Sequence, residues 1–336
     1  MAGSLHLRPV AGGHEVFTAR IDDVELPAGE YLTARTVWLS EDGTGEHELR
    51  QHRPVAGDGR REGYLRLDNE IFAGRRLYQA AGSRRGYPQE LACLYGDEAT
   101  SAEPYALFEP YRGKPLSEVA EGVFAEETES FATGLLTALC WLAGVGVAHR
   151  AISPDTVLWD GYRVQVTDFS HSMAFGLART PITGLRNWVA PESRPDTCQG
   201  AVGPADDVWA AARLIFYFRT GGQDLQDRAD LDKYNLASLF NGLLQYVIGP
   251  PETRPTASDL VEYGLRRPHL VPGLNDLSMQ LRGRRASFLN AREVKHPGAE
   301  IPDGFMDDIT WRPSLWGPGG TGAGSTGAGG SGGGTG

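Results

Sequence analysis

Two short polar motifs flank a predicted hairpin and carry residue types that can move protons or hold a metal. Strand-forming runs at 156–159 and 163–167 are separated by Asp160-Gly161, a pair that favours a tight turn. If the runs pair, His149-Arg150 and Asp168-Phe169 lie side by side at the open end of the hairpin. The spacing also allows a structural histidine and a turn aspartate. No acidic or nucleophilic neighbour in the loop makes a dyad with His149, which favours the structural role.

The elements around this hairpin divide the chain into two unlike parts. Strands are predicted over 16–21, 31–39 and 105–108, and apolar spacing predicts one helix over 65–78. Beyond residue 110 the pattern is mostly helical: an apolar stripe runs through 131–142, and 208–218 is apolar on nearly every side. An α+β fold with two lobes joined near residue 110 follows from these patterns.

Composition restricts the class of protein. The 336 residues carry a net charge of −11, which disfavours general binding to nucleic acids. Three dispersed cysteines predict reduced thiols and no zinc site. The uncharged run 131–148 predicts a buried helix and a Gly-rich turn, because its glycines and threonines suit a membrane span poorly. We therefore expect a cytoplasmic protein without a membrane segment, and the strong bias of arginine over lysine is typical of a GC-rich genome.

The ordered motifs of the second half resemble those of protein kinases. The segment 149–170, HRAISPDTVLWDGYRVQVTDFS, resembles the catalytic loop HRDLKxxN, its hairpin and the DFG turn. Ala190-Pro191-Glu192 matches the APE motif, and Asp207-Val208-Trp209 and Arg254-Pro255-Thr256 are similar to the start of the central helix and to the RPT of a late helix. The resemblance covers about residues 10 to 268. It implies a bilobal protein-kinase-like fold of the bacterial Ser/Thr type, with a small β-rich N-lobe (10–110) and a large helical C-lobe (111–268).

The resemblance also assigns roles in the first half and at the nucleotide site. Residues 105–111 are similar to the strand and hinge that join the lobes, and Glu70 to the glutamate of the N-lobe helix. Gly12 and Gly13 are the candidate remnant of the glycine-rich loop. Asp168 is the family's metal ligand. These three are the candidate nucleotide- and metal-binding residues, and Glu192 is expected to pair with Arg254.

Most of the family's catalytic groups are absent from the matching positions. Ala151 stands where the proton-accepting aspartate is expected, Ser153 where a lysine contacts phosphate, and Thr156 where an asparagine binds metal. Thr36 stands where the small-lobe lysine is expected. What the chain keeps is mainly the structural skeleton of the family: His149, Arg150, Phe169, Glu192, Asp207 and Arg254.

These replacements predict a pseudokinase, a scaffold or regulator that binds a protein partner. We expect no catalytic residues and no bound cofactor, with ATP and Mg²⁺ as the candidates if a nucleotide binds. The alternative is an active atypical kinase with displaced catalytic groups, using Asp155 or Asp168 and an arginine such as Arg35. A third possibility is a structural subunit whose tail tethers a partner.

Two further regions follow the kinase-like core. Residues 269–316 combine a predicted amphipathic helix with a Pro-rich stretch that contains Trp311 and Trp316. They are interpreted either as a strap on the large lobe or as a docking segment for a protein partner. Ser287 lies in a sequence that resembles a basophilic kinase substrate. Residues 317–336 are Gly-rich and uncharged and are predicted to be a disordered tail.

Overall fold

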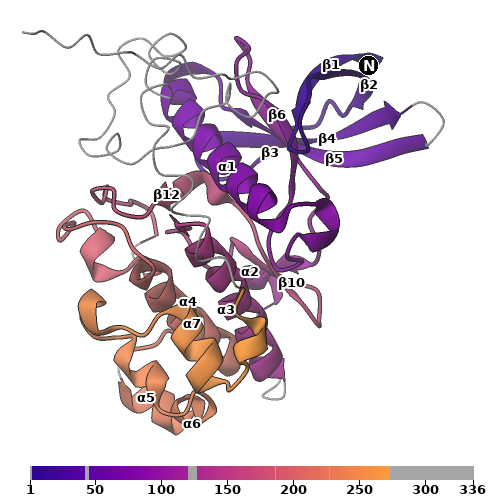
Figure 1. The fold of residues 1–336 in the computed structure, drawn as a ribbon. Helices are drawn as coiled ribbons and strands as arrows, with labels where there is room; N and C mark the ends of the chain where they lie inside the picture. The colour runs from indigo at the N-terminus through magenta and orange to yellow at the C-terminus, as the bar shows by residue number, and fades with distance from the viewer. Residues whose placement is uncertain (1, 42–44, 120–126, 186, 227, 273–336) are drawn as a thin grey trace, which may run out of the picture.

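The chain combines a strand-rich N-terminal part with a helix-rich C-terminal part (Figure 1). The computed structural model describes residues 2–41, 45–119, 127–185, 187–226 and 228–272. The tail, Ser287, both late tryptophans and all but the first residues of the 269–316 extension lie outside the described residues. None of the described helices is long and apolar enough to cross a membrane.

Six strands of the N-terminal part close into a barrel. Their order is β2-β1-β6-β7-β5-β4, and an additional pairing of β2 with β4 completes the ring, while the short β3 pairs with β4. Apolar side chains from β1, β2, β4, β5 and β7 form one buried cluster. The strands are β1 (Ala2–Pro9), β2 (Glu15–Ile21), β3 (Leu26–Pro27), β4 (Leu32–Glu41), β5 (Gly45–Pro54), β6 (Leu94–Glu98) and β7 (Tyr105–Phe108). The predicted strands are confirmed, whereas β1, β5, β6 and the closure of the barrel were not predicted.

One long helix connects the two parts. Helix α1 (Arg60–Ala81) contains the predicted 65–78 segment and ends at Gly82, whose left-handed φ of +69° provides the usual helix stop. Its buried face carries Leu67, Ile71 and Leu77, which join the main core cluster. That cluster continues into the C-terminal part, so α1 packs against both parts.

The C-terminal part is built around two buried helices, α3 (Thr128–Gly144) and α4 (Ala205–Thr220). Phe131 of α3 stacks on Phe218 of α4 with ring centroids 4.0 Å apart, and Trp159 packs edge-on against both rings. The predicted burial of 131–142 and of 208–218 is confirmed. The shorter elements are β8 (Lys114–Pro115), α2 (Leu116–Val119), β9 (Val147–Ala148), β12 (Met173–Ala174), α5 (Arg228–Lys233), α6 (Leu236–Leu239) and α7 (Ala257–Asp259).

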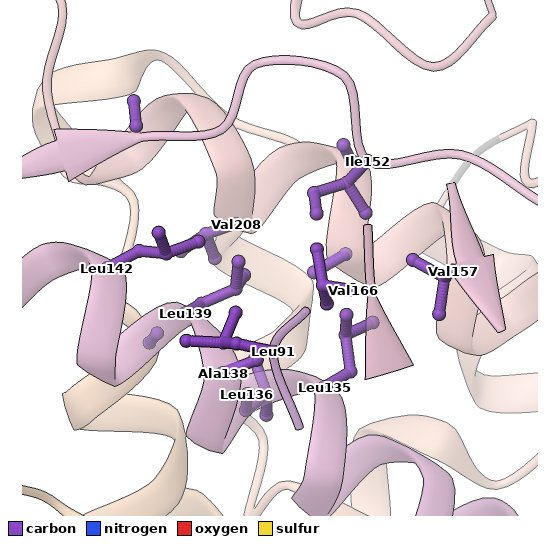
Figure 2. Packing of buried hydrophobic residues seen from close by; sticks show 14 of the residues in the cluster. Leu91, Leu135, Leu136, Ala138, Leu139, Leu142, Ile152, Val157, Val166 and Val208 are labelled. Carbon is purple, nitrogen blue, oxygen red and sulfur yellow. The ribbon is translucent and has the colours of Figure 1, made fainter. Parts of the chain in front are cut away.

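The predicted hairpin is present as β10 (Val157–Trp159) and β11 (Val164–Val166), which pair antiparallel with Leu158 opposite Gln165. Asp160 makes the turn, because its carboxylate accepts from the backbone N–H groups of Tyr162 and Arg163. Figure 2 shows Val157 and Val166 of the hairpin in the same apolar cluster as Ile152 and the side chains of α3. The hairpin is therefore anchored in the core, which holds its two flanking motifs in place.

Candidate functional site

One aspartate binds the backbone of the loop that precedes the hairpin, residues 149–156. Asp207, in the first turn of α4, accepts hydrogen bonds from the backbone N–H groups of His149 and Arg150, each at 2.7 Å. Arg150 has a left-handed backbone (φ +68°), so these two bonds stabilise a conformation that costs a non-glycine residue energy. Burial raises the pKa of Asp207 to about 7, although both backbone bonds oppose the shift.

His149 is fully buried, and both of its ring nitrogens make hydrogen bonds to the backbone. Its Nε2 lies 2.9 Å from the carbonyl oxygen of Thr167, and its Nδ1 accepts from the backbone N–H of Ala151 at 3.2 Å. This assigns the neutral tautomer with the proton on Nε2. The ring is fully buried against Phe169, and burial lowers the His149 pKa. The two ends of the hairpin meet as predicted, with His149 as a neutral link between them.

Three small side chains of this loop, those of Ala151, Ser153 and Thr156, are buried. Ala151 and Ser153 are fully buried, and Thr156 is 6% exposed. The Thr156 hydroxyl donates to the carbonyl oxygen of Ala151 at 2.7 Å and accepts from the backbone N–H of Ser153 at 3.0 Å. The side chains at these three positions are therefore hydrogen-bonded within the loop or apolar, and they present no carboxylate, amine or amide to a reactant. The carboxylate of the loop is that of Asp155, which is exposed and accepts a hydrogen bond from Ser117.

Asp168 follows the hairpin with a left-handed backbone (φ +58°), and its carboxylate accepts from the N–H of Ser170 at 3.2 Å. The nearest glycine turn is the one between β3 and β4, where a Cβ added to Gly29 would lie 3.6 Å from Oδ2 of Asp168. Gly12 and Gly13, which sequence reasoning placed at this site, lie instead in the β1–β2 turn. The role of Gly12 and Gly13 in nucleotide binding stays a prediction, and Gly29 is the glycine whose added Cβ would approach Asp168.

A polar cluster with two buried and two partly exposed members lies between β5, α1 and the segment after β7. It consists of Arg50, His52, Glu70 and Tyr111, which we call the His52 cluster. His52 Nδ1 lies 2.7 Å from Oε2 of Glu70, and His52 Nε2 accepts from Nε of Arg50 at 3.1 Å. The Tyr111 hydroxyl is 3.3 Å from the same Nε2, and the Arg50 guanidinium lies over the Tyr111 ring. Burial raises the pKa of Glu70 and of Tyr111, so both protons are held more tightly than in water.

Thr36, the residue expected at the position of the small-lobe lysine, is not a member of this cluster. In protein kinases the small-lobe lysine pairs with the helix glutamate. Here the partner of Glu70 is His52, on the strand that leads into α1, whereas Thr36 lies on β4 opposite Arg50. The sequence offered little signal for β5, because 46–53 is rich in charged and histidine side chains and lacks an apolar run.

Helix α1 reaches the segment after Asp168 through two side chains. Asn69 donates to the carbonyl oxygen of Ser170 at 2.8 Å, and Arg66 Nη1 lies 2.8 Å from Nδ1 of His171. Burial, together with the nearby Arg66 guanidinium, lowers the pKa of His171 to about 3. These contacts fix Glu70 and Asp168 relative to each other through the helix that carries Glu70.

The comparisons with known proteins give partial matches. No protein-family model matches the chain. Sperm motility kinase Z of Mus musculus is 27% identical in an alignment of 184 positions that covers 49% of this chain and 36% of the relative. CBL-interacting protein kinases 32 and 33 of Oryza sativa subsp. japonica are 27% identical over 157 residues and 30% identical over 109 residues. They are covered to 35% and 23% of their length. These relatives support a protein-kinase-like domain. The chain spans little more than a third of the length of the curated relatives it matches.

The skeleton of this protein-kinase-like domain includes an ion pair that the sequence predicted. Arg254 binds both carboxylate oxygens of Glu192, at 2.5 and 3.0 Å, and both side chains are buried. Such a bidentate pair positions the segment around Glu192 against the end of the C-terminal part. Arg150 binds Thr180 through both its backbone carbonyl and its hydroxyl. Phe169 is fully buried beside His149.

Proposed function

We propose that this chain is a bilobal pseudokinase: a protein-kinase-like domain, with lobes at 10–110 and 111–268, that binds and regulates a protein partner without transferring phosphate. The observation that carries the proposal is the closed 149–156 loop. General-base assistance is commonly worth 10²- to 10⁴-fold. Ala151, at the position of the proton-accepting aspartate, has no acceptor atom in its side chain, and Asp155 of the same loop is bound by Ser117. The buried hydrogen bonds of Thr156 make this a packed structural turn.

The His52 cluster supports the same conclusion. A lysine at this place would donate to phosphate, but His52 already donates from Nδ1 to Glu70 and accepts at Nε2 from Arg50. Its imidazole therefore has no free N–H for a phosphate oxygen. The Tyr111 hydroxyl, buried beside Nε2, covers the cluster on a further side.

The residues present do not fit a magnesium–nucleotide complex. Magnesium prefers several oxygen ligands in near-octahedral geometry. Asp168 is the one carboxylate that the family resemblance assigns to the metal, and the hydroxyl of Thr156 is already used within the loop. Among the described residues no group of three His, Cys, Asp or Glu side chains could hold a metal ion. We derive no step through such a complex.

The alternative, an atypical active kinase, is favoured by one observation. Arg50 places a cation beside His52, where a displaced phosphate contact would be needed. The other groups considered for it are engaged elsewhere. Arg35 binds Gln51 at 2.6 Å, and Asp155 accepts from Ser117 at 2.6 Å.

Phosphate transfer distinguishes the two. The full chain is incubated with Mg²⁺-ATP and a mixture of generic protein substrates, and incorporated phosphate is measured by mass spectrometry for the wild type and for Asp168→Ala. The pseudokinase proposal predicts the same background for both. Incorporation by the wild type that is lost in Asp168→Ala would establish the atypical kinase instead.

A further inference from the structure

A basic hollow lies on the outer side of the segment that joins the two parts. It has a volume of about 470 Å³ and lies between the turn after α1, the residues that follow β7 and β11. Three arginines line it, Arg84, Arg85 and Arg112, against a single carboxylate, Glu109. In a chain with a net charge of −11, this local excess of positive charge is a distinct feature of the surface.

Two of the three arginines are available to pair with carboxylates of a ligand. Arg84 pairs with Glu109 at 2.5 Å. Within the part of the chain that the structure describes, no carboxylate pairs with Arg85 or Arg112, and both side chains are exposed. Between them the hollow has an apolar lining that includes Pro88, Leu91 and Pro110. It therefore offers cationic groups around an apolar floor, which suits an acidic segment with apolar side chains.

The chain itself contains a segment of this chemistry. Residues 300–311, EIPDGFMDDITW, carry four carboxylates and no basic residue, interleaved with apolar side chains. We infer that this segment is the occupant of the basic hollow, bound within the same chain. The carboxylates would pair with Arg85 and Arg112, and the apolar side chains would contact the floor.

The last described residues lie near the basic hollow, so a short length of chain connects them to the acidic segment. Arg267 and Leu270 line a second hollow together with Glu90 and Arg163. Gln89, the neighbour of Glu90, lines the basic hollow and accepts a hydrogen bond from Arg163, so the two hollows are adjacent. Twenty-eight positions separate residue 272 from residue 300, and a coil of that length spans about 30 Å. The segment can therefore reach the hollow from its own chain.

Occupation would also contact the His52 cluster. Tyr111 lines the basic hollow and at the same time places its hydroxyl 3.3 Å from His52. The inference does not depend on whether the domain transfers phosphate, because it concerns the outer face and a different set of charged groups.

Zero-length cross-linking tests the inference, and the chain suits it because its native lysines number three, Lys114, Lys233 and Lys295. Arg85→Lys keeps the charge and adds an amine that carbodiimide joins to a carboxylate in contact. Arg60→Lys, on the exposed first turn of α1, is the matched control. Both are made in the full chain, and circular dichroism and thermal unfolding verify that each folds like the wild type.

A tethered segment at millimolar effective concentration should give links from position 85 to the peptide of residues 300–308 at about ten times the yield of the control. Asp307→Asn with Asp308→Asn should lower that yield several-fold. Mixing isotope-labelled and unlabelled chains distinguishes the source of the segment. Links confined to single chains support the inference. Equal yields at positions 85 and 60, or links mainly between differently labelled chains, would overturn it.

Discussion

His52 and Glu70 form a buried pair in which Nδ1 of the imidazole lies 2.7 Å from the carboxylate. In the proposed pseudokinase this pair takes the place of the lysine and helix glutamate of protein kinases. The imidazole keeps α1 connected to β5 as a lysine would. It does so without a cation directed at phosphate, because its other nitrogen accepts from Arg50. The pair thus connects α1 to β5 and directs no cation of its own outward.

Removing His52 should therefore destabilise the domain through Glu70. In His52→Ala the Glu70 carboxyl is left buried without its partner, which costs about 3 kcal/mol of unfolding free energy. His52→Leu combined with Glu70→Leu removes both polar groups and should cost less. Urea denaturation of the two variants measures the difference. A double variant that loses more stability than the single one would contradict this role.

The ion pair of Glu192 and Arg254 should contribute far more than a matched surface pair. The side chains of Arg254 and Glu192 are 2% and 6% exposed, whereas those of Arg267 and Glu129 are 42% and 49% exposed at the same 2.5 Å separation. We expect Arg254→Met to cost about 3–5 kcal/mol, because it leaves a buried carboxylate unpaired. Arg267→Met should cost no more than about 1 kcal/mol. Similar losses in denaturant titrations of the two variants would refute the structural importance of the buried pair.

Acid should weaken the contact of α1 with the segment after Asp168. The pKa of His171 is lowered to about 3 by burial and by the nearby charges of Arg66 and Arg150, so the folded protein holds this imidazole neutral. The unfolded chain takes up a proton near pH 6.5, so the stabilisation present above that pH is lost as the pH falls from about 6.5 toward 3.

The loss from this one group should approach about 1 kcal/mol per pH unit below pH 6. His171→Asn keeps an acceptor for Arg66 without the titration, so its unfolding free energy should depend less steeply on pH. His14→Asn, at a half-exposed histidine, is the control. If the unfolding free energies of the wild type and His171→Asn changed equally with pH between 4.5 and 7, the proposed contribution of His171 would be contradicted.

Restoring the family's residues in the loop should not restore activity. Ala151 and Ser153 are both fully buried, so Ala151→Asp with Ser153→Lys places two charges in a site built for small neutral side chains. We expect a less stable protein with no phosphate transfer. The assay of incorporated phosphate measures one effect and thermal unfolding the other. A restored variant that is active and as stable as the wild type would show that the loop is open.

The elements with clear local sequence patterns could be predicted from the sequence. The Asp160-Gly161 turn and its flanking β-rich runs predicted the hairpin, and the spacing of Leu67, Ile71 and Leu77 predicted α1. The ion pair of Arg254 followed from the motif resemblance. Each of these depends on residues that are neighbours in the sequence or members of a recognisable motif.

The N-terminal part of the site was harder to predict because it depends on strand pairing. β5 pairs with both β4 and β7 but carries mainly charged and histidine side chains, so its sequence lacks the apolar alternation that identifies a strand. Without β5, the sequence gives no indication that His52 lies beside Glu70. Gly29 was missed for the same reason: its proximity to Asp168 arises from the barrel and has no counterpart in the spacing along the chain.

The most direct test of the central claim is thermal unfolding of the full chain with saturating ATP, with and without magnesium. A ligand at a hundred times its dissociation constant adds about 2.7 kcal/mol, which raises the midpoint by several degrees for a protein of this size. With the 149–156 loop closed and His52 engaged by Glu70, Arg50 and Tyr111, we predict no magnesium-dependent shift. A rise of several degrees that requires both ATP and magnesium, and that Asp168→Ala abolishes, would contradict the account.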